Sequence, residues 1–150
     1  GRISEFGTVE VKDYLSIRKF SHVIHIESKV VGKLRNDLDQ LDAISALLPA
    51  GTLSGAPKIR ACQIINEIEG RRRGIYGGAI GYIDFTGNMD TCIAIRFAVL
   101  KDNTVYVQSG GGIVADSVPE TEYIETTKKA QAVINALELS GKELTNDSIN

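Results

Sequence analysis

The sequence predicts an α+β domain with antiparallel strands, on the basis of three observations. Several stretches alternate apolar and polar residues, as half-buried strands do. Three other stretches place apolar residues at spacings of three and four, which is typical of amphipathic helices. Eleven of the 15 glycines lie between residues 51 and 112, where short strands follow one another with turn residues between them. These strands are flanked by helices along the chain, so we expect a mixed class with the strands grouped together.

The composition is that of an ordinary globular protein. Of 150 residues, 43% are hydrophobic and 24% are charged, with a net charge of -2, which excludes a disordered or collagen-like chain. Nucleic acid is not an expected partner because the chain has no excess positive charge. A membrane is not expected either, because no window approaches 18 consecutive apolar residues. Cys62 and Cys92 lack the spacing of a zinc site, so we expect buried, reduced thiols in a cytoplasmic protein.

The first expected element is a half-buried strand in SHVIHIESKVVGKL, which begins at residue 21. Ile24 and Ile26 lie on one side of it, and His25 and Glu27 lie on the other. Glu27 can tune His25 for acid or base chemistry, although a single histidine on such a strand is more often structural. His22 falls on the opposite face from His25, so the two histidines cannot share a metal ion.

Two helices are expected next. In NDLDQLDAISALL the apolar residues recur at spacings of three and four, with Asn36 or Asp37 as the N-cap. A second helix is expected over residues 56 to 69, with Ser54 as its N-cap and Pro57 in its first turn. The loop PAGTLSG joins the two helices. The basic run RRR after the second helix is interpreted as a solvated surface corner.

Three strand-like segments follow: IYGGAIGYIDF, MDTCIAIRFAVLK and TVYVQSGGGIV. Turn residues at 86–88 and 101–103 separate them, which favours an antiparallel meander. In a continuous middle strand, Cys92, Ala94 and Arg96 would share a face of small side chains. A guanidinium there has room for an anionic ligand. A solvent-facing arginine is an equally good interpretation of the same pattern.

The glycine run Gly110, Gly111 and Gly112 comes between the last strand and the last helix. Glycines leave backbone N–H groups unshielded, so the run can approach a carboxylate or a phosphate closely. It has neither the Walker nor the dinucleotide-binding spacing. A strand end where two elements approach each other is the alternative interpretation.

The last element is a long helix that begins near Pro119. Ser117 and Glu120 have the spacing of a capping box. The expected buried stripe contains Tyr123, Thr127, Ala130, Ile134 and Leu137. The polar tail, residues 141–150, is expected to fray.

Two glutamates lie in the first turns of this helix. Glu122 and Glu125 are three residues apart, so they share a face other than the apolar stripe. They can bind a metal ion, but the helix dipole by itself also favours acidic residues at this position. From the local sequence, both interpretations stay open.

Four segments occur together and in order: PAGTLSGAPKIRA, RRRGIYGGAIGYIDFTGNMDTCIAIR, QSGGGIVADSVPETEYIET and KKA. Together they resemble the C-terminal part of the chorismate-utilising enzymes, and the resemblance covers residues 1 to 139. The PAGT form is typical of the anthranilate synthase branch, with aminodeoxychorismate synthases and isochorismate synthases as alternatives. The resemblance implies antiparallel sheets packed together with helices outside, over residues 1–140, followed by the tail 141–150.

The resemblance also implies a reaction. Chorismate and ammonia would be converted to anthranilate and pyruvate with Mg²⁺, in tryptophan biosynthesis. The ammonia would come from a glutamine amidotransferase partner subunit. A non-catalytic module that binds the partner subunit or a dicarboxylate is the alternative from a different class.

Site residues follow from the same resemblance, position by position. His25 matches the acid–base histidine. Thr52 in PAGT matches a substrate-contacting position and is, with His25, a candidate catalytic residue. Tyr76 and Arg96 match substrate-contacting positions, and the run 110–112 matches a backbone cradle for a carboxylate. Glu125 matches a metal ligand, with Glu122 in the same metal environment. Mg²⁺ prefers oxygen ligands and keeps several waters, which suits two glutamates on one helical face.

In that family a further metal-ligand glutamate and the N-terminal half of the fold precede the matched part. We therefore expect this chain to contain much of the substrate site but an incomplete metal site. Alone, it is expected to be weakly active or inactive. A smaller difference is the middle residue of the glycine run, Gly111, where related sequences often have alanine.

Overall fold

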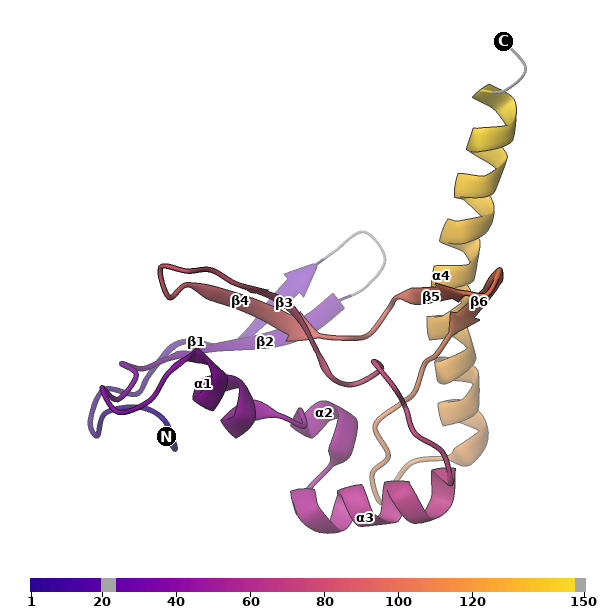
Figure 1. Cartoon of the computed structure of the whole chain (residues 1–150). Helices are drawn as coiled ribbons and strands as arrows, with labels where there is room; N and C mark the ends of the chain where they lie inside the picture. The colour runs from indigo at the N-terminus through magenta and orange to yellow at the C-terminus, as the bar shows by residue number, and fades with distance from the viewer. Residues whose placement is uncertain (20–23, 148–150) are drawn as a thin grey trace. The chain divides into compact units, whose positions relative to one another are not determined.

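The computed structural model describes residues 1–19 and 24–147. The strands are β1 (Glu10–Lys19), β2 (Ile24–Val31), β3 (Ala79–Ile83), β4 (Met89–Ile93), β5 (Ala98–Lys101) and β6 (Thr104–Val107). The helices are α1 (Gln40–Leu47), α2 (Gly51–Ser54), α3 (Lys58–Glu69) and α4 (Pro119–Asp147) (Figure 1). Each strand pairs with its neighbour in sequence, as β1–β2, β3–β4 and β5–β6. This mixture of helices and hairpins confirms the predicted α+β class.

The chain divides into two compact units. Unit 1 comprises Gly1–Leu48 together with Ile83–Met89, which is the end of the β3–β4 hairpin. Unit 2 comprises Pro49–Tyr82 and Asp90–Asn150. His25 belongs to unit 1, and the other predicted site residues belong to unit 2.

Unit 1 contains the antiparallel β1–β2 hairpin. Strand β2 confirms the predicted strand from Ile24 onward, and residues 21–23, including His22, lie outside the described residues. Strand β1 was not predicted from the sequence, because β1 pairs irregularly with β2. The register shifts between Asp13 and Ser16, and Leu15 between them has a φ of 50°. Such a bulge interrupts the side-chain alternation from which a strand is recognised.

Helix α1 begins later than predicted. Its N-cap is Asp39, whose side chain accepts a hydrogen bond from the backbone N–H of Asp42 at 3.0 Å. The Asp42 carboxylate accepts one in return from the Asp39 N–H at 3.0 Å, which completes a capping box. Asp37 instead binds Arg35, with 3.0 Å between Nε and Oδ1. Neither Asn36 nor Asp37 is therefore the cap.

The helix predicted over residues 56 to 69 is α3, and the short α2 precedes it. Pro57 is the N-cap of α3 rather than a first-turn residue. Ser54 ends α2, and its hydroxyl donates to the Ala50 carbonyl at 3.0 Å, so it does not cap α3. Gly70 is the C-cap of helix α3, and its φ of 59° lies in the left-handed region that glycine adopts with least strain.

The predicted three-strand meander is two separate hairpins. The expected middle strand breaks after Ile93 and resumes at Ala98, and Arg96 in the break has a φ of 59°. Arg96 therefore does not belong to a strand face with Cys92, because side-chain alternation holds only along a continuous strand. Within the β3–β4 pair, an ideal Cβ on Gly81 would lie 2.0 Å from the carbonyl oxygen of Asp90. The glycine is required there for two backbones to approach each other.

The turn predicted at residues 101–103 is confirmed between β5 and β6. Asp102 and Asn103 have φ values of 49° and 60°, and both residue types tolerate this left-handed conformation. The paired strands β5 and β6 are antiparallel, with Lys101 opposite Thr104.

Helix α4 begins at Pro119, as predicted, but without the expected capping box. The N–H groups of Thr121 and Glu122 donate to the carbonyl of Val118, at 3.0 and 3.1 Å. The hydroxyl of Ser117 instead donates to the side chain of Glu122. The helix continues to Asp147, into the segment where a frayed tail is expected.

The inward face of α4 is also rotated from the predicted stripe. Tyr123, the first residue of that stripe, is 73% exposed. Between residues 119 and 141 of α4, the half-buried residues are Glu122, Thr126, Lys129, Ala130, Val133 and Ile134. The covered face is therefore polar near the start of the helix and apolar further along.

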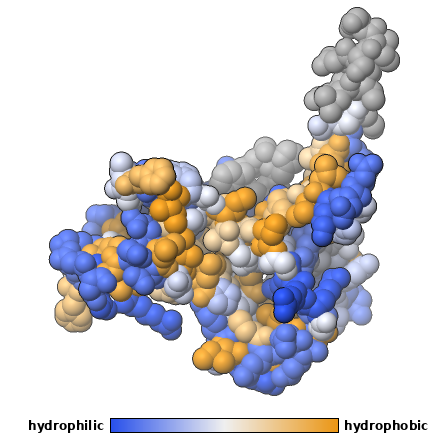
Figure 2. Space-filling model, in the orientation of Figure 1, coloured by the Kyte–Doolittle hydropathy of each residue, from blue (hydrophilic) through white to orange (hydrophobic). Residues whose placement is uncertain are grey.

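Large apolar side chains remain exposed in both units. Among the described residues, the buried hydrophobic ones are Ala43, Tyr76 and Ala94, whereas Ile59 and Ile68 of α3 are 78% and 79% exposed. Figure 2 shows apolar side chains on the surface among the hydrophilic ones. The cysteines differ from expectation in the same way, because Cys62 is half-buried and Cys92 is exposed. The described residues thus leave apolar faces uncovered.

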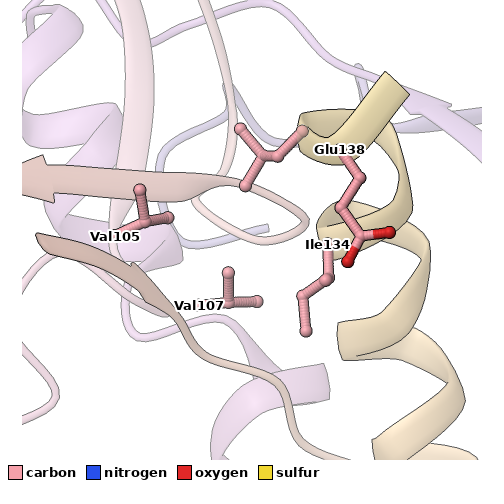
Figure 3. Close-up of a pocket in the computed structure, with 5 residues that line it drawn as sticks. Val105, Val107, Ile134 and Glu138 are labelled. Carbon is pink, nitrogen blue, oxygen red and sulfur yellow. The ribbon is translucent and has the colours of Figure 1, made fainter. Parts of the chain in front are cut away.

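A cavity of about 550 Å³ lies between the β5–β6 hairpin and α4 (Figure 3). It is lined by Val105, Val107, Ile134, Leu137 and Glu138. The lining is apolar apart from Glu138 and includes none of the predicted site residues. Among the helices of the described chain, none is long and apolar enough to cross a membrane.

Candidate functional site

The glycine run follows β6 and lies close to both Tyr76 and α4. An ideal Cβ on Gly110 would lie 3.4 Å from the hydroxyl oxygen of Tyr76. An ideal Cβ on Gly111 would lie 3.2 Å from Oε2 of Glu122 and 3.5 Å from Oγ1 of Thr126. Tyr76 itself is only 8% exposed. The fold of unit 2 thus brings together three features that are far apart in the sequence.

Two serines attach the glycine run and the following loop to α4. The hydroxyl of Ser109 donates to the backbone carbonyl of Thr126 at 2.7 Å. The hydroxyl of Ser117 donates to Oε1 of Glu122 at 2.7 Å and accepts from the N–H of Val114 at 3.0 Å. Ser117 therefore orients a candidate metal ligand and does not cap the helix. The five-residue spacing between Ser117 and Glu122 matches no standard motif, so the sequence pattern did not reveal this bond.

Glu125 forms an ion pair with Lys129, one turn further along α4. The hydrogen bond and the positive charge of Lys129 hold the pKa of the Glu125 carboxyl below its ordinary value, and Arg96 contributes a smaller effect in the same direction. The lysine side chain is 24% exposed, whereas Glu125 is 54% exposed. This pair follows from the sequence, because Lys129 lies one turn after Glu125 and an acidic residue four positions before a lysine on a helix is a known pairing signal.

Arg96 is positioned by the backbone around it rather than by a strand. The N–H of Gly77 donates to the carbonyl of Ala94, and the N–H of Ala94 donates to the carbonyl of Gly78, both at 2.9 Å. These bonds join the Tyr76 loop to the segment that leads to Arg96. The left-handed φ of Arg96 is uncommon for a residue with a side chain.

Thr52 lies in α2, next to a contact with the Tyr76 loop. An ideal Cβ on Gly77 would lie 3.0 Å from Cδ1 of Leu53, and Gly77 has a φ of 84°. Leu53 therefore packs against the backbone directly after Tyr76. The PAGT loop and the Tyr76 loop are neighbours within unit 2.

His25 lies on β2 of unit 1, with its side chain exposed. In the hairpin register it stands opposite Arg18. Glu27, expected to tune His25, forms an ion pair with Arg18 at 3.7 Å. The geometry of unit 1 by itself thus leaves the acid–base role of His25 a prediction.

The oxygen donors on α4 suit a magnesium ion. Glu122 and Glu125 offer carboxylates one turn apart, and Ser117 holds one of them in a fixed orientation. Over the part of the chain that the structure describes, no group of three or more histidine, cysteine or acidic side chains could hold a metal ion. Binding of Mg²⁺ by Glu122 and Glu125 therefore stays a prediction.

The family model described as "chorismate binding enzyme" matches residues 1–135, and the chain belongs to this family. Among solved structures, the chain is similar to anthranilate synthase component I from Streptococcus pneumoniae TIGR4. The two share 51% identity with a TM-score of 0.86, over 89% of this chain and 31% of that one.

Two curated relatives are also named anthranilate synthase component 1. The protein from Acetivibrio thermocellus is 56% identical over 95% of this chain and 29% of its own length. The protein from Bacillus caldotenax is 59% identical over 92% of this chain and 27% of its own length. A putative 2,3-dihydroxybenzoate-specific isochorismate synthase from Bacillus anthracis is less similar, at 32% identity and a TM-score of 0.80, over 89% of this chain and 36% of that one. The chain thus spans less than a third of the length of these curated relatives.

Proposed function

We propose that the protein containing this chain converts chorismate and ammonia to anthranilate, pyruvate and water. The observation on which this rests most is the glycine run held against Tyr76 and Glu122, in a chain 51% identical to a solved anthranilate synthase component I. The identity to an isochorismate synthase is lower, at 32%. Amination is therefore favoured over hydration as the first step.

Chorismate has two carboxylates, so its site needs two separate holders of negative charge. Arg96 can bind one carboxylate through two parallel N–H donors. The backbone N–H groups of residues 110–112 can donate to the same substrate, because no side chains shield them. Backbone hydrogen bonds of Ala94 join the segment that leads to Arg96 to the Tyr76 loop. The glycine run lies against Tyr76 as well.

Glu122 and Glu125 are the residues that would hold Mg²⁺, which when bound supplies positive charge to the second carboxylate and to the departing hydroxyl. Lys129 neutralises Glu125 through an ion pair. Ser117 restrains the Glu122 carboxylate by donating a hydrogen bond to Oε1.

The remaining residues move protons and position the ring. His25 can donate a proton to the leaving hydroxyl, or transfer one during pyruvate loss, because an imidazole can act as either a general acid or a general base. Thr52 and Tyr76 are the proposed substrate contacts from the PAGT loop and the neighbouring tyrosine loop. The overall sequence is amination of the ring with loss of water, followed by elimination of pyruvate.

The proposed ammonia source is a glutamine amidotransferase subunit. The exposed apolar faces of both units are compatible with coverage by further protein. The product would enter tryptophan biosynthesis. The free thiols of Cys62 and Cys92 are consistent with a reducing, cytoplasmic location.

The test is product analysis with the protein expressed at the full length that its gene encodes. Incubation with chorismate, ammonium and Mg²⁺ should yield fluorescent anthranilate and an equal amount of pyruvate. Isochorismate or an aminodeoxychorismate as the final product would contradict the proposal. Calorimetry separates an enzyme from a non-catalytic module, because chorismate binding should strengthen with Mg²⁺ and be lost in Arg96→Ala.

For the 150 residues alone, we propose weak or no activity. The donor set on α4 is a pair of carboxylates, and large apolar side chains such as Ile59 are exposed. Purified 150-residue chain is compared with the full-length Streptococcus pneumoniae enzyme under the same conditions. Anthranilate production at a comparable rate would contradict this proposal.

A further inference from the structure

Arg73 is the last of three consecutive arginines, and its side chain is held at three points. Its Nε lies 2.9 Å from Oε2 of Glu69, and its Nη2 lies 2.6 Å from Oε1 of the same carboxylate. Its Nη1 donates to the backbone carbonyl of Leu53 at 2.9 Å. One guanidinium thus joins Glu69, at the end of α3, to Leu53 in α2. Leu53 lies 20 residues before Arg73 in the chain.

This geometry corrects the interpretation of the arginine run as a solvated corner. Arg71 and Arg72 are exposed, but the Arg73 side chain is only 26% exposed and that of Glu69 32% exposed. The hydrogen bond from Arg73 holds the pKa of the Glu69 carboxyl below its ordinary value, so the pair stays charged. A two-point pair fixes the guanidinium plane, which leaves the third donor aimed at a single backbone oxygen.

The hydrogen bond from Arg73 to the Leu53 carbonyl lies next to the candidate site. Leu53 directly follows Thr52, and its side chain packs against Gly77, directly after Tyr76. Gly77 in turn donates to Ala94, in the segment that leads to Arg96. The α2 turn contains four residues and has no side-chain N-cap, so the bond from Arg73 is a side-chain restraint on it that comes from outside the turn.

We propose that Arg73 is a positioning residue for the chorismate site: held by Glu69, it acts through the Leu53 carbonyl to keep Thr52 in place beside the Tyr76 loop. The proposal rests on the proposed function for its kinetic consequence. Its structural consequence, a rigid α2, is independent of any activity. Arg73 does not touch substrate in this account.

The kinetic test uses Arg73→Met and its matched control Arg72→Met in the full-length protein. Both variants remove one guanidinium from the same run, but only the first loses the bonds to Glu69 and Leu53. Loss of a hydrogen bond from a charged donor predicts roughly a tenfold decrease in kcat/KM for chorismate in Arg73→Met. Arg72→Met should keep the unmodified value. Equal effects of the two substitutions would overturn the proposal.

Hydrogen exchange measured by mass spectrometry supplies a readout that needs no turnover. The amides of Leu53, Ser54 and Gly55 are bonded to carbonyls of the α2 turn. They should exchange several-fold faster in Arg73→Met and at an unchanged rate in Arg72→Met. Unchanged exchange in both variants would overturn the proposal. If the unmodified protein makes no anthranilate but exchange accelerates as expected, the proposed function fails while the positioning role stands.

Two further variants keep the test informative if Arg73→Met folds poorly. Lysine can reach Glu69 or Leu53 but cannot make the two-point pair and the third bond together, so Arg73→Lys should give partial rescue of kcat/KM. Glu69→Gln leaves Arg73 in place but removes the opposite charge, and should give an intermediate loss. Full activity in both variants would contradict the proposal.

Discussion

The two units hold their predicted site residues by different means. In unit 1, the backbone pairing of β2 with β1 places His25 opposite Arg18. The side chain of His25 is exposed. In unit 2, Tyr76 is buried, and Glu122 is bonded by a serine from the preceding loop. Site geometry in unit 1 is therefore local, whereas in unit 2 it depends on contacts between segments far apart in the chain.

This difference predicts where indirect substitutions matter. Around His25, changes to neighbouring side chains should have small effects, because exposed residues on a paired strand share few contacts. Around Glu122 and Thr52, residues that never touch substrate should matter, because they hold the residues that do.

Replacement of His25 by alanine should lower kcat by roughly 10²- to 10⁴-fold with a smaller change in KM, because general acid–base catalysis is worth that much. Amination and pyruvate elimination are measured separately in the full-length protein by rapid quenching. Lys29→Gln, on the same face of β2, is the control and should have little effect. Unchanged rates of both steps in His25→Ala would remove the catalytic role.

Replacement of Arg96 should weaken chorismate binding by roughly 10- to 100-fold, because a charge-assisted hydrogen-bond pair is lost. Alanine and glycine remove the same guanidinium, but glycine tolerates the left-handed φ of 59° without strain. Both variants should lose binding equally in calorimetry, and Arg96→Gly should be more stable than Arg96→Ala by about 1 kcal/mol. Chorismate affinity close to that of the unmodified protein would contradict the proposed substrate contact.

Replacement of Ser117 by alanine should weaken divalent-metal binding by roughly three- to tenfold, because Glu122 loses the donor that orients it. Mn²⁺ in place of Mg²⁺ allows the affinity to be measured by electron paramagnetic resonance without turnover. Ser117→Thr keeps the hydroxyl and should restore affinity, and Thr121→Ala in the first turn of α4 is the control. Equal affinities in all of these variants would show that Glu122 needs no support from Ser117.

The smallest effect is expected at Asp84, in the turn between β3 and β4. Hydrogen bonds from the side chains and backbone N–H groups of Asn88 and Thr86 lower the pKa of Asp84 to about 2. A lowered pKa in the folded state contributes stability that is complete above the ordinary value of 3.8 and is lost as pH falls toward 2. The difference in Tm between the unmodified protein and Asp84→Asn should therefore shrink over that interval.

The expected change at Asp84 is a few degrees at most, because the carboxylate is well solvated. Thr86→Val removes one hydroxyl donor, at 2.8 Å from Oδ1, and should reduce the pH dependence without abolishing it. A difference in Tm that is constant from pH 6 to pH 2 would contradict the assignment. Chorismate kinetics at neutral pH should not change, since the substituted side chains bond within this turn and the turn's bond to Gln40 of α1 uses the carbonyl of Gly87.

The expectations drawn from periodicity are correct where the chain is regular. Strand β2, helix α1 and the body of α3 agree with the prediction, because alternation and spacings of three and four are typical of strands and helices with one apolar face. Burial of those faces was not predicted correctly, since Ile26 of β2 and Ile59 of α3 are 71% and 78% exposed. Helix boundaries were less accurate. Asn36, Asp37 and Ser54 are all chemically capable caps, and the choice among them depended on a competing partner, such as Arg35 for Asp37.

The site was predictable only as a set of residue types. The resemblance selected Tyr76, the glycine run and Glu122, and the structure brings these three together. It did not select Ser117 as a partner of Glu122 or Arg73 as a support for α2. Each of these roles depends on which way a side chain turns once its element has packed.

By itself, the sequence determined the α+β class, the chorismate-binding family and the chemical groups available to a site. These properties depend on residue type and spacing along the chain, which folding does not alter. Only the tertiary structure decided that α4 covers its Glu122 face rather than its Tyr123 face, and that the expected strand through Arg96 breaks. Both outcomes follow from contacts between distant segments, because packing against a neighbour outweighs the preferences of either segment alone.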